Sequence, residues 1–155
     1  MPLAVQANDE LTMKASLAYN LAKFVKWPEQ AQPKEYWQLC YFSEVYDQVF
    51  KPLQNKKLLG KELHVKRLRE VSEVMSCHIV YIDADNRGFL RRLFVALEKK
   101  PTLTISDSRG FADQGGMLEV VSADSKLRFK VNNTEMKNSN LLMSSKALRL
   151  AVEVK

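Results

Sequence analysis

The sequence is poor in the residues that most small catalytic and metal sites require. It has two histidines and two cysteines among 155 residues, and their spacings fit no common zinc motif. The five glycines form neither a dinucleotide-binding nor a nucleoside-triphosphate-binding loop. No G-x-S-x-G nucleophile motif occurs either. We therefore predict a protein that is not an enzyme and that holds no metal or cofactor.

Long apolar runs and low-complexity segments are also missing. No run approaches the ~18 residues needed to cross a bilayer. Because 46% of the residues are hydrophobic, the chain can bury a core, and we expect a single domain over residues 8–155. Val5-Gln6-Ala7 places small residues at the −3 and −1 positions of a signal-peptidase site. Residues 1–7 are either the tail of a secretory signal or an ordinary leader.

Charge of one sign is only modestly in excess. The 24 Lys and Arg against 18 Asp and Glu give a net charge of +6, which favours anionic surroundings. The basic residues are mostly dispersed, as on solvated helix faces. We expect acidic protein surfaces as partners, and no nucleic acid.

The apolar residues follow both strand and helix periods. "YWQLCYF", "CHIVYID" and "TLTIS" are strand-length apolar runs, and "KELHVKRL" alternates. Strands alternating with helices predict a mostly parallel sheet flanked by helices. "MLEVV" and "LRFKVN" predict an antiparallel hairpin that places Leu127, Phe129 and Val131 inward, followed by a final helix from Ser144 or Ser145. The expected helices span 8–27, 45–53, 69–75 and 87–100.

The first predicted helix raises a question at its end. Met13, Leu17, Leu21 and Phe24 form its apolar stripe, and Trp27-Pro28 stops it because proline disfavours helical geometry in the residue before it. Trp27 either caps the core or is an exposed aromatic anchor, a residue type favoured at interface hot spots. The Trp27-Pro28 corner is one candidate partner surface. The second is the basic face formed by Arg87, Arg91 and Arg92.

The loop "SDSRGFADQGGM" carries the alternative function. Exposed N–H groups around Gly115 and Gly116 can form an anion-binding nest, with Arg109 completing the site of a small-ligand sensor. The other interpretation is that the paired glycines turn the chain into the hairpin. Asp107 and Asp113 flank this loop, and we expect them to make turn hydrogen bonds.

The two cysteines allow two interpretations, a disulfide or two free thiols. Each opens or lies within an apolar strand, and the first and third strands of a parallel sheet are often neighbours. An exported chain favours a Cys40–Cys77 bond, whereas a cytosolic one would keep two buried thiols.

Several segments together resemble one family. "SLAYNLAKFVKWP", "LCYF", "CHIVYI", "LTISDSRGFADQGGM", "LRFKVN" and "LLMSSKALRLA" are similar, in the same order, to blocks of the YfiR-like family of bacterial periplasmic proteins. The resemblance runs from about Leu11 to Ala151.

The resemblance implies an α/β domain exported to the periplasm. Its best understood member restrains a membrane-bound diguanylate cyclase by contacting the cyclase's periplasmic part, and an outer-membrane lipoprotein titrates it. The resemblance also implies a Cys40–Cys77 disulfide. A second disulfide of some relatives has no counterpart among these residues. The expected partners are thus an inner-membrane cyclase, an outer-membrane lipoprotein and, as a homodimer, a second copy of the chain.

Overall fold

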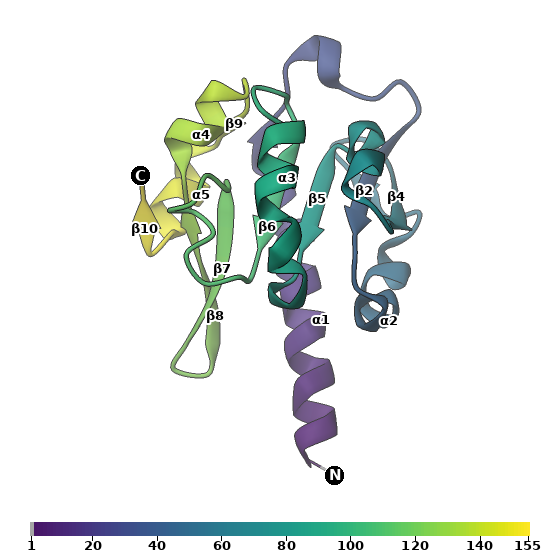
Figure 1. Cartoon of the computed structure of the whole chain (residues 1–155), viewed down its shortest axis with the longest axis vertical. Coiled ribbons are helices and arrows are strands. Elements are labelled where there is room, and N and C mark those ends of the chain that lie inside the picture. Colours follow the sequence, from purple (N-terminus) through teal and green to yellow (C-terminus); the bar gives the residue numbers. More distant parts are fainter. Residues whose placement is uncertain (1) are drawn as a thin grey trace.

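The strands predicted from apolar runs form the centre of an eight-stranded mixed sheet (Figure 1). The computed structural model describes residues 2–155, with side chains from Asp9 onward. The sheet order is β10-β8-β7-β6-β5-β2-β4-β3. Its five neighbouring parallel strands are β4 (Lys61–Arg67), β2 (Tyr36–Tyr41), β5 (Ile79–Ile82), β6 (Leu103–Ser106) and β7 (Leu118–Ala123).

The strand order has a reversal that marks one place on the sheet. When the five parallel strands are numbered in chain order, their order across the sheet is 2-1-3-4-5. This strand order is common among doubly wound α/β folds. The order reverses between β2 and β5. In such folds, ligands bind in the crevice outside the carboxyl ends of the strands at this point.

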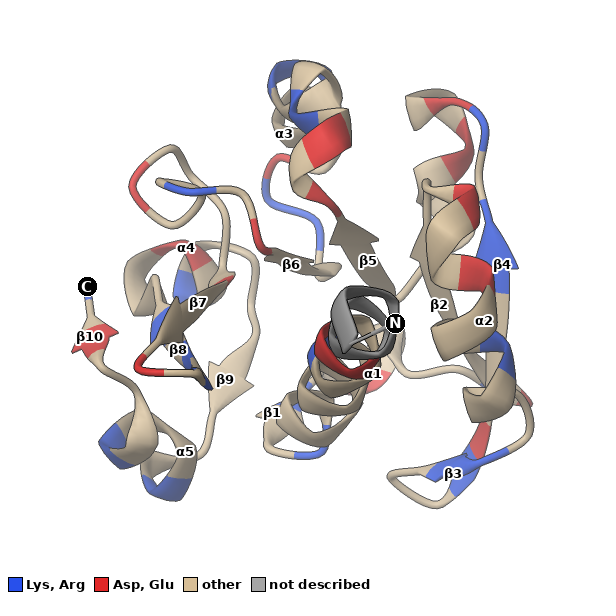
Figure 2. Ribbon diagram, turned by 90° about the horizontal axis from the view of Figure 1, so that it is seen from below, with Lys and Arg blue, Asp and Glu red and all other residues tan. Residues whose placement is uncertain are grey.

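Both faces of the sheet are covered, as the continuous apolar runs predicted. In β5, Ile79 and Tyr81 belong to one core cluster, and Val80 and Ile82 to the other, as expected for side chains that alternate along a strand. The first cluster lies under α1 (Pro2–Ala22) and α2 (Asp47–Phe50). The second lies under α3 (Leu90–Ala96) and the 3-10 helix η4 (Val71–Ser76). Figure 2 shows α1 and α3 on opposite sides of the sheet.

The first helix differs from the prediction in its end and in its buried stripe. It ends at Ala22, before Trp27, because the chain then pairs as β1 (Val25–Lys26) with β9 (Leu142–Met143). Met13 is 44% exposed, and Leu17 and Phe24 are half-buried. The buried stripe is instead Ala15, Ala18, Leu21 and Ala22. Because three of these four side chains are small, the helix can approach the sheet closely.

The predicted hairpin and final helix are confirmed. β7 pairs antiparallel with β8 (Lys126–Val131). Asp124 and Ser125 form the turn with φ values of 52° and 64°, the left-handed pair that a tight hairpin requires. The last helix, α5 (Ser145–Leu150), begins at a Ser144 cap whose hydroxyl accepts from the Ala147 N–H.

Several short elements were not predicted. The strands have only two residues each, too few for an alternating pattern, and β1, β9 and β10 form only where a distant strand pairs with them. The short strands and helix are β1, β9, β3 (Lys57–Leu58), β10 (Glu153–Val154) and α4 (Asn133–Asn138). The remaining 3-10 helices are η1 (Glu29–Ala31), η2 (Glu44–Tyr46), η3 (Lys51–Leu53) and η5 (Ala84–Phe89).

The Cys40–Cys77 disulfide is present. Cys40 lies on β2, and Cys77 precedes β5, the neighbouring parallel strand. The two Cα atoms are 6.0 Å apart, a normal separation for a disulfide. Both residues are buried, at 0% and 5% exposure.

The signal-peptidase site predicted near the start of the chain is not tested. The side chains of Val5, Gln6 and Ala7, proposed above as a signal-peptidase site, lie outside the described residues. None of the helices in the described chain has the length and apolar content needed to cross a membrane.

Candidate functional site

Trp27 is a core residue, so its interpretation as an exposed partner anchor was wrong. It is 1% exposed and its ring centroid lies 4.6 Å from that of Trp37. The β1–β9 pairing holds this segment against the sheet. Pro28 is half-buried. The Trp27–Pro28 corner can therefore offer a partner only its proline and the residues around it.

A shallow hollow of ≈ 390 Å³ lies beside Pro28. Lys26 and Leu142 are register partners on the outer side of the β1–β9 pair, and Leu142 is 53% exposed. The hollow thus combines apolar and basic surface. Its lining is Lys26, Trp27, Pro28, Gln30, Lys137, Asn140 and Leu142. Sequence reasoning missed Lys137 and Leu142, because no local pattern places them beside Pro28.

The predicted basic face lies on η5 and α3. Arg87, Arg91 and Arg92 are all exposed, and Figure 2 shows the basic residues of α3 on the outside of the molecule. The Arg92 guanidinium lies 5.1 Å from the centroid of the Phe89 ring. Val95, which is 72% exposed, adds an apolar side chain to the same helix. The surface therefore has the charged rim and apolar element that a protein contact uses.

The loop proposed to bind an anion already binds a carboxylate of the chain itself. Gly110 N–H donates to Glu119 Oε2 at 3.1 Å, and Ala112 N–H donates to Glu119 Oε1 at 3.0 Å. Glu119 comes from β7 and is 2% exposed. Two N–H groups of the loop are therefore already hydrogen-bonded within the chain.

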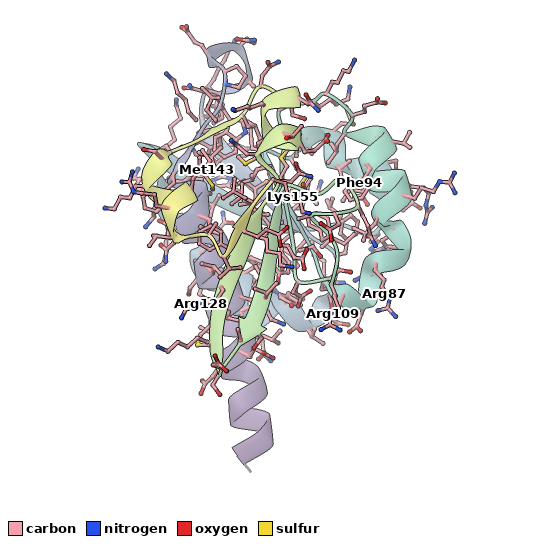
Figure 3. The ribbon with its side chains drawn as sticks, turned by 90° about the vertical axis from the view of Figure 1, so that its left-hand side faces the viewer. Arg87, Phe94, Arg109, Arg128, Met143 and Lys155 are labelled. Carbon is pink, nitrogen blue, oxygen red and sulfur yellow. A yellow bond between two sulfur atoms is a disulfide. The ribbon has the colours of Figure 1, made fainter. Side chains whose placement is uncertain are left out.

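Arg109 and the two glycines do not line a common cavity. Arg109 is exposed (Figure 3) and lines a hollow that also contains the carboxylates of Asp107, Asp113 and Glu119. Gly115 lines a different cavity, next to Phe94. A Cβ on Gly116 would lie 2.1 Å from the Phe111 ring. Gly116 is thus required by packing, and Gly115, at φ +117°, by the turn.

A residue of α1 lies at the carboxyl edge of the sheet, near the strand-order reversal. Lys14 Nζ lies 2.7 Å from Asp107 Oδ2. The Tyr46 hydroxyl donates to the same oxygen at 3.2 Å, and the Ala84 N–H donates to Asp107 Oδ1 at 2.8 Å. Asp107 therefore joins four segments rather than making the turn hydrogen bonds that we expected. Asp113 instead pairs with Lys155.

Asp83 lies beside this cluster with incomplete hydrogen bonding. It is 4% exposed. Its Oδ1 accepts from Asn86 Nδ2 at 2.7 Å, whereas Oδ2 has no partner among the described residues. Burial raises the pKa of Asp83, and burial likewise raises the pKa of the Tyr46 hydroxyl. In both cases burial disfavours the charged form, because a charged group loses its hydration when it is buried.

The histidines serve the fold. His78 Nδ1 accepts from the Gln38 N–H at 3.0 Å, and burial lowers the pKa of His78. His64 stacks on Tyr36 with a centroid distance of 3.9 Å. Across the described residues, no group of three or more His, Cys, Asp or Glu side chains could hold a metal ion.

Comparison with known proteins identifies the family. A family model described as YfiR/HmsC-like matches residues 11–152. The chain belongs to the YfiR/HmsC-like family. Membership fits a regulatory role exerted through protein–protein interaction. No curated protein matches the chain.

Among solved structures, the YfiR/HmsC-like chain is similar to one described as the ABC domain in complex with L-Trp from Streptococcus pneumonia. The two share 10% identity with a TM-score of 0.59, over 94% of this chain and 60% of the other. At this identity the similarity shows the fold alone. The chain spans 60% of that structure's length.

Proposed function

We propose that this protein is an exported regulator that restrains a membrane-bound diguanylate cyclase from the periplasm. The observation that carries the proposal is the family match over residues 11–152, because the best understood member of the YfiR-like family acts in this way. The Cys40–Cys77 bond supports export, since structural disulfides persist in oxidising compartments such as the periplasm.

Regulation without chemistry requires differential affinity. A regulator shifts its partner's activity only by as much as it binds one of the partner's states better than the other. A stable contact of ordinary size covers roughly 800 Å² on each protein. The periplasmic part of the cyclase is the proposed partner, and an outer-membrane lipoprotein is the proposed competitor for the same protein.

The basic face is the proposed steering surface. Arg87, Arg91 and Arg92 are exposed on one helical segment, and charges at the rim of an interface accelerate encounter with an oppositely charged partner. The hollow beside Pro28 offers the second surface, in which exposed Leu142 would supply the apolar contact that buried Trp27 cannot. Apolar contacts there would prolong the complex rather than speed its formation.

Binding kinetics with the purified periplasmic region of the cyclase test the proposal. Arg91→Glu should slow association by roughly 3- to 10-fold at low salt and weaken its salt dependence. Arg149→Glu on α5 is the matched control, because it makes the same charge change at another exposed arginine. Leu142→Asn should instead raise the dissociation rate, with exposed Leu150→Asn as its control.

Cellular measurements complete the test. Loss of the protein should raise cyclic-di-GMP, and restoring the parent chain should lower it again. A purified cyclase region that forms no complex, together with unchanged cyclic-di-GMP, would overturn the proposed function. If binding occurs but Arg91→Glu and Arg149→Glu behave alike, the contact surface lies elsewhere.

A further inference from the structure

One side of the sheet carries a continuous surface formed by β1, β9 and α5. Lys26 on β1 and Leu142 on β9 are register partners. The Ser144 N–H, at the cap of α5, donates to Phe24 O at 2.8 Å. Figure 2 shows α1, β1 and α5 together on one side of the sheet, with α3 on the other. We call this surface the β1–α5 face, and its exposed residues are Lys23, Lys26, Leu142, Lys146, Arg149 and Leu150.

The charge of the β1–α5 face is of one sign. The two chain segments that form it, 19–28 and 136–152, contain five Lys or Arg residues and no Asp or Glu. Among the described residues, no ion pair involves a basic residue of these segments. Figure 2 accordingly shows blue and no red on α5. Uncompensated positive charge over a whole surface favours an anionic partner.

The same face exposes aliphatic side chains among its charges. Leu142 is 53% and Leu150 64% exposed. Lys23, Lys26 and Leu142 line one shallow hollow of ≈ 350 Å³, so basic and apolar side chains gather at the same place. The hollow continues to Ser144, where α5 begins. The β1–α5 face therefore offers a partner both charge and apolar contact.

The composition of this face suits a lipid surface better than a protein. Protein interfaces are enriched in aromatic residues and Arg and depleted in Lys. Here three of the four exposed basic residues are lysines, and the nearby aromatic residues Trp27 and Phe24 are buried and half-buried. Leucines surrounded by basic side chains are typical of proteins that lie on a membrane. A cluster of about four or more Lys and Arg residues attracts anionic lipids.

We propose that the β1–α5 face binds the surface of a membrane that contains anionic phospholipids. The lysines and Arg149 contact the lipid phosphates, and Leu142 and Leu150 reach the boundary between headgroups and acyl chains. Leu142 also lines the hollow beside Pro28, so a partner anchored in the same membrane can reach that hollow. The inference does not rest on the proposed function, because lipid binding requires no cyclase.

Vesicle flotation with the purified full chain tests the inference. Vesicles of phosphatidylglycerol and phosphatidylethanolamine in equal parts should carry the protein with them, whereas vesicles of phosphatidylcholine should not. Binding should weaken as salt is added, because salt screens the attraction between the basic side chains and the lipid phosphates. The inference is overturned if the anionic vesicles carry no protein, or if both kinds of vesicle carry it equally.

Charge-reversal variants locate the binding surface. Lys26→Glu and Arg149→Glu should each raise the apparent lipid Kd by at least about fivefold, because each replaces an attracted charge with a repelled one. Arg91→Glu is the matched control, since it makes the same charge change at an exposed arginine of α3, on the opposite side of the sheet (Figure 2). An equal loss with Arg91→Glu would show that only the net charge matters, and would contradict the assignment to this face.

Leu150→Asn tests the apolar contact. It should raise the lipid Kd by about threefold or more and leave the salt dependence unchanged, and Val95→Asn on α3, which is 72% exposed, is its control. Thermal unfolding should confirm that every variant is folded. If Arg149→Glu weakens binding to the purified cyclase region and leaves vesicle binding unchanged, the face is a protein contact and the lipid assignment is wrong. That outcome would leave the proposed restraint of a cyclase standing.

Discussion

Lys14 of α1 and Asp107 after β6 form an ion pair of 2.7 Å across the carboxyl edge of the sheet. The two side chains are only 15% and 10% exposed, so solvent screens the pair weakly. In other folds with this strand order, the same crevice receives a ligand. Here the first helix supplies a charged side chain at this edge of the sheet, which ties α1 to three other segments of the chain.

Lys14→Met should lower the free energy of unfolding by about 2 kcal/mol, because it leaves a nearly buried carboxylate without its cation. Urea unfolding measures the change. Exposed Lys34→Met is the control and should stay within about 0.5 kcal/mol of the parent. A loss no larger than that of the control would show that the pair does not hold α1.

Asp83→Asn should stabilise the protein at neutral pH. The pKa of Asp83 is raised in the folded protein, so folding favours the protonated carboxyl. The protonated carboxyl stabilises the fold fully at pH values below the ordinary pKa of aspartate. This stabilisation is lost as the pH rises through the pKa that Asp83 has in the folded protein. Asparagine keeps the oxygen that accepts from Asn86 and removes the charge. Unfolding free energies of variant and parent should therefore converge as pH falls towards 4. A constant difference across pH would contradict this origin, and Glu44→Gln controls for general charge effects.

Gly116→Ala should destabilise the fold by about 1–3 kcal/mol, the cost of overpacking a core. Its Cβ would lie 2.1 Å from the ring of Phe111, which is fully buried. Gly88→Ala is the matched control, because nothing lies within 4 Å of its Cβ position and its φ is not positive. In thermal or urea unfolding, equal effects of the two substitutions would show that Phe111 moves aside without cost.

The Cys40–Cys77 bond should contribute about 3–4 kcal/mol, the chain-entropy value for a sequence separation of 37. Urea unfolding of the oxidised protein should show this loss on adding reductant. The Cys40→Ala/Cys77→Ala variant should be equally destabilised and insensitive to reductant. The prediction would be contradicted if reductant left the unfolding midpoint of the parent protein unchanged while mass measurement showed two free thiols.

Much of the fold is predictable because it depends on short-range pattern. The run "CHIVYID" is apolar at consecutive positions, and β5 is buried on both faces. Leu90, Leu93 and Leu97 recur with the helical period, and all three are buried, the first two on α3 and Leu97 at its C-terminal cap. In both cases, neighbouring residues alone carry the signal. Cys40 lies on β2 and Cys77 just before β5, and these strands are neighbours as in the usual order of a parallel sheet.

The sites depended on contacts between residues that are distant in sequence. Trp27 is buried because β1 pairs with β9, more than a hundred residues later in the chain. Asp107 faces Lys14, and Glu119 takes N–H groups of the Arg109 loop, through packing that no local pattern records. The sequence by itself determined the central strands and the longer helices, because hydrophobic periodicity is a local property, whereas the choice between a disulfide and two thiols depended on the family resemblance. Only the tertiary structure decided which polar groups are paired, buried or left facing a cavity, because hydrogen bonding and desolvation depend on neighbours that folding brings together.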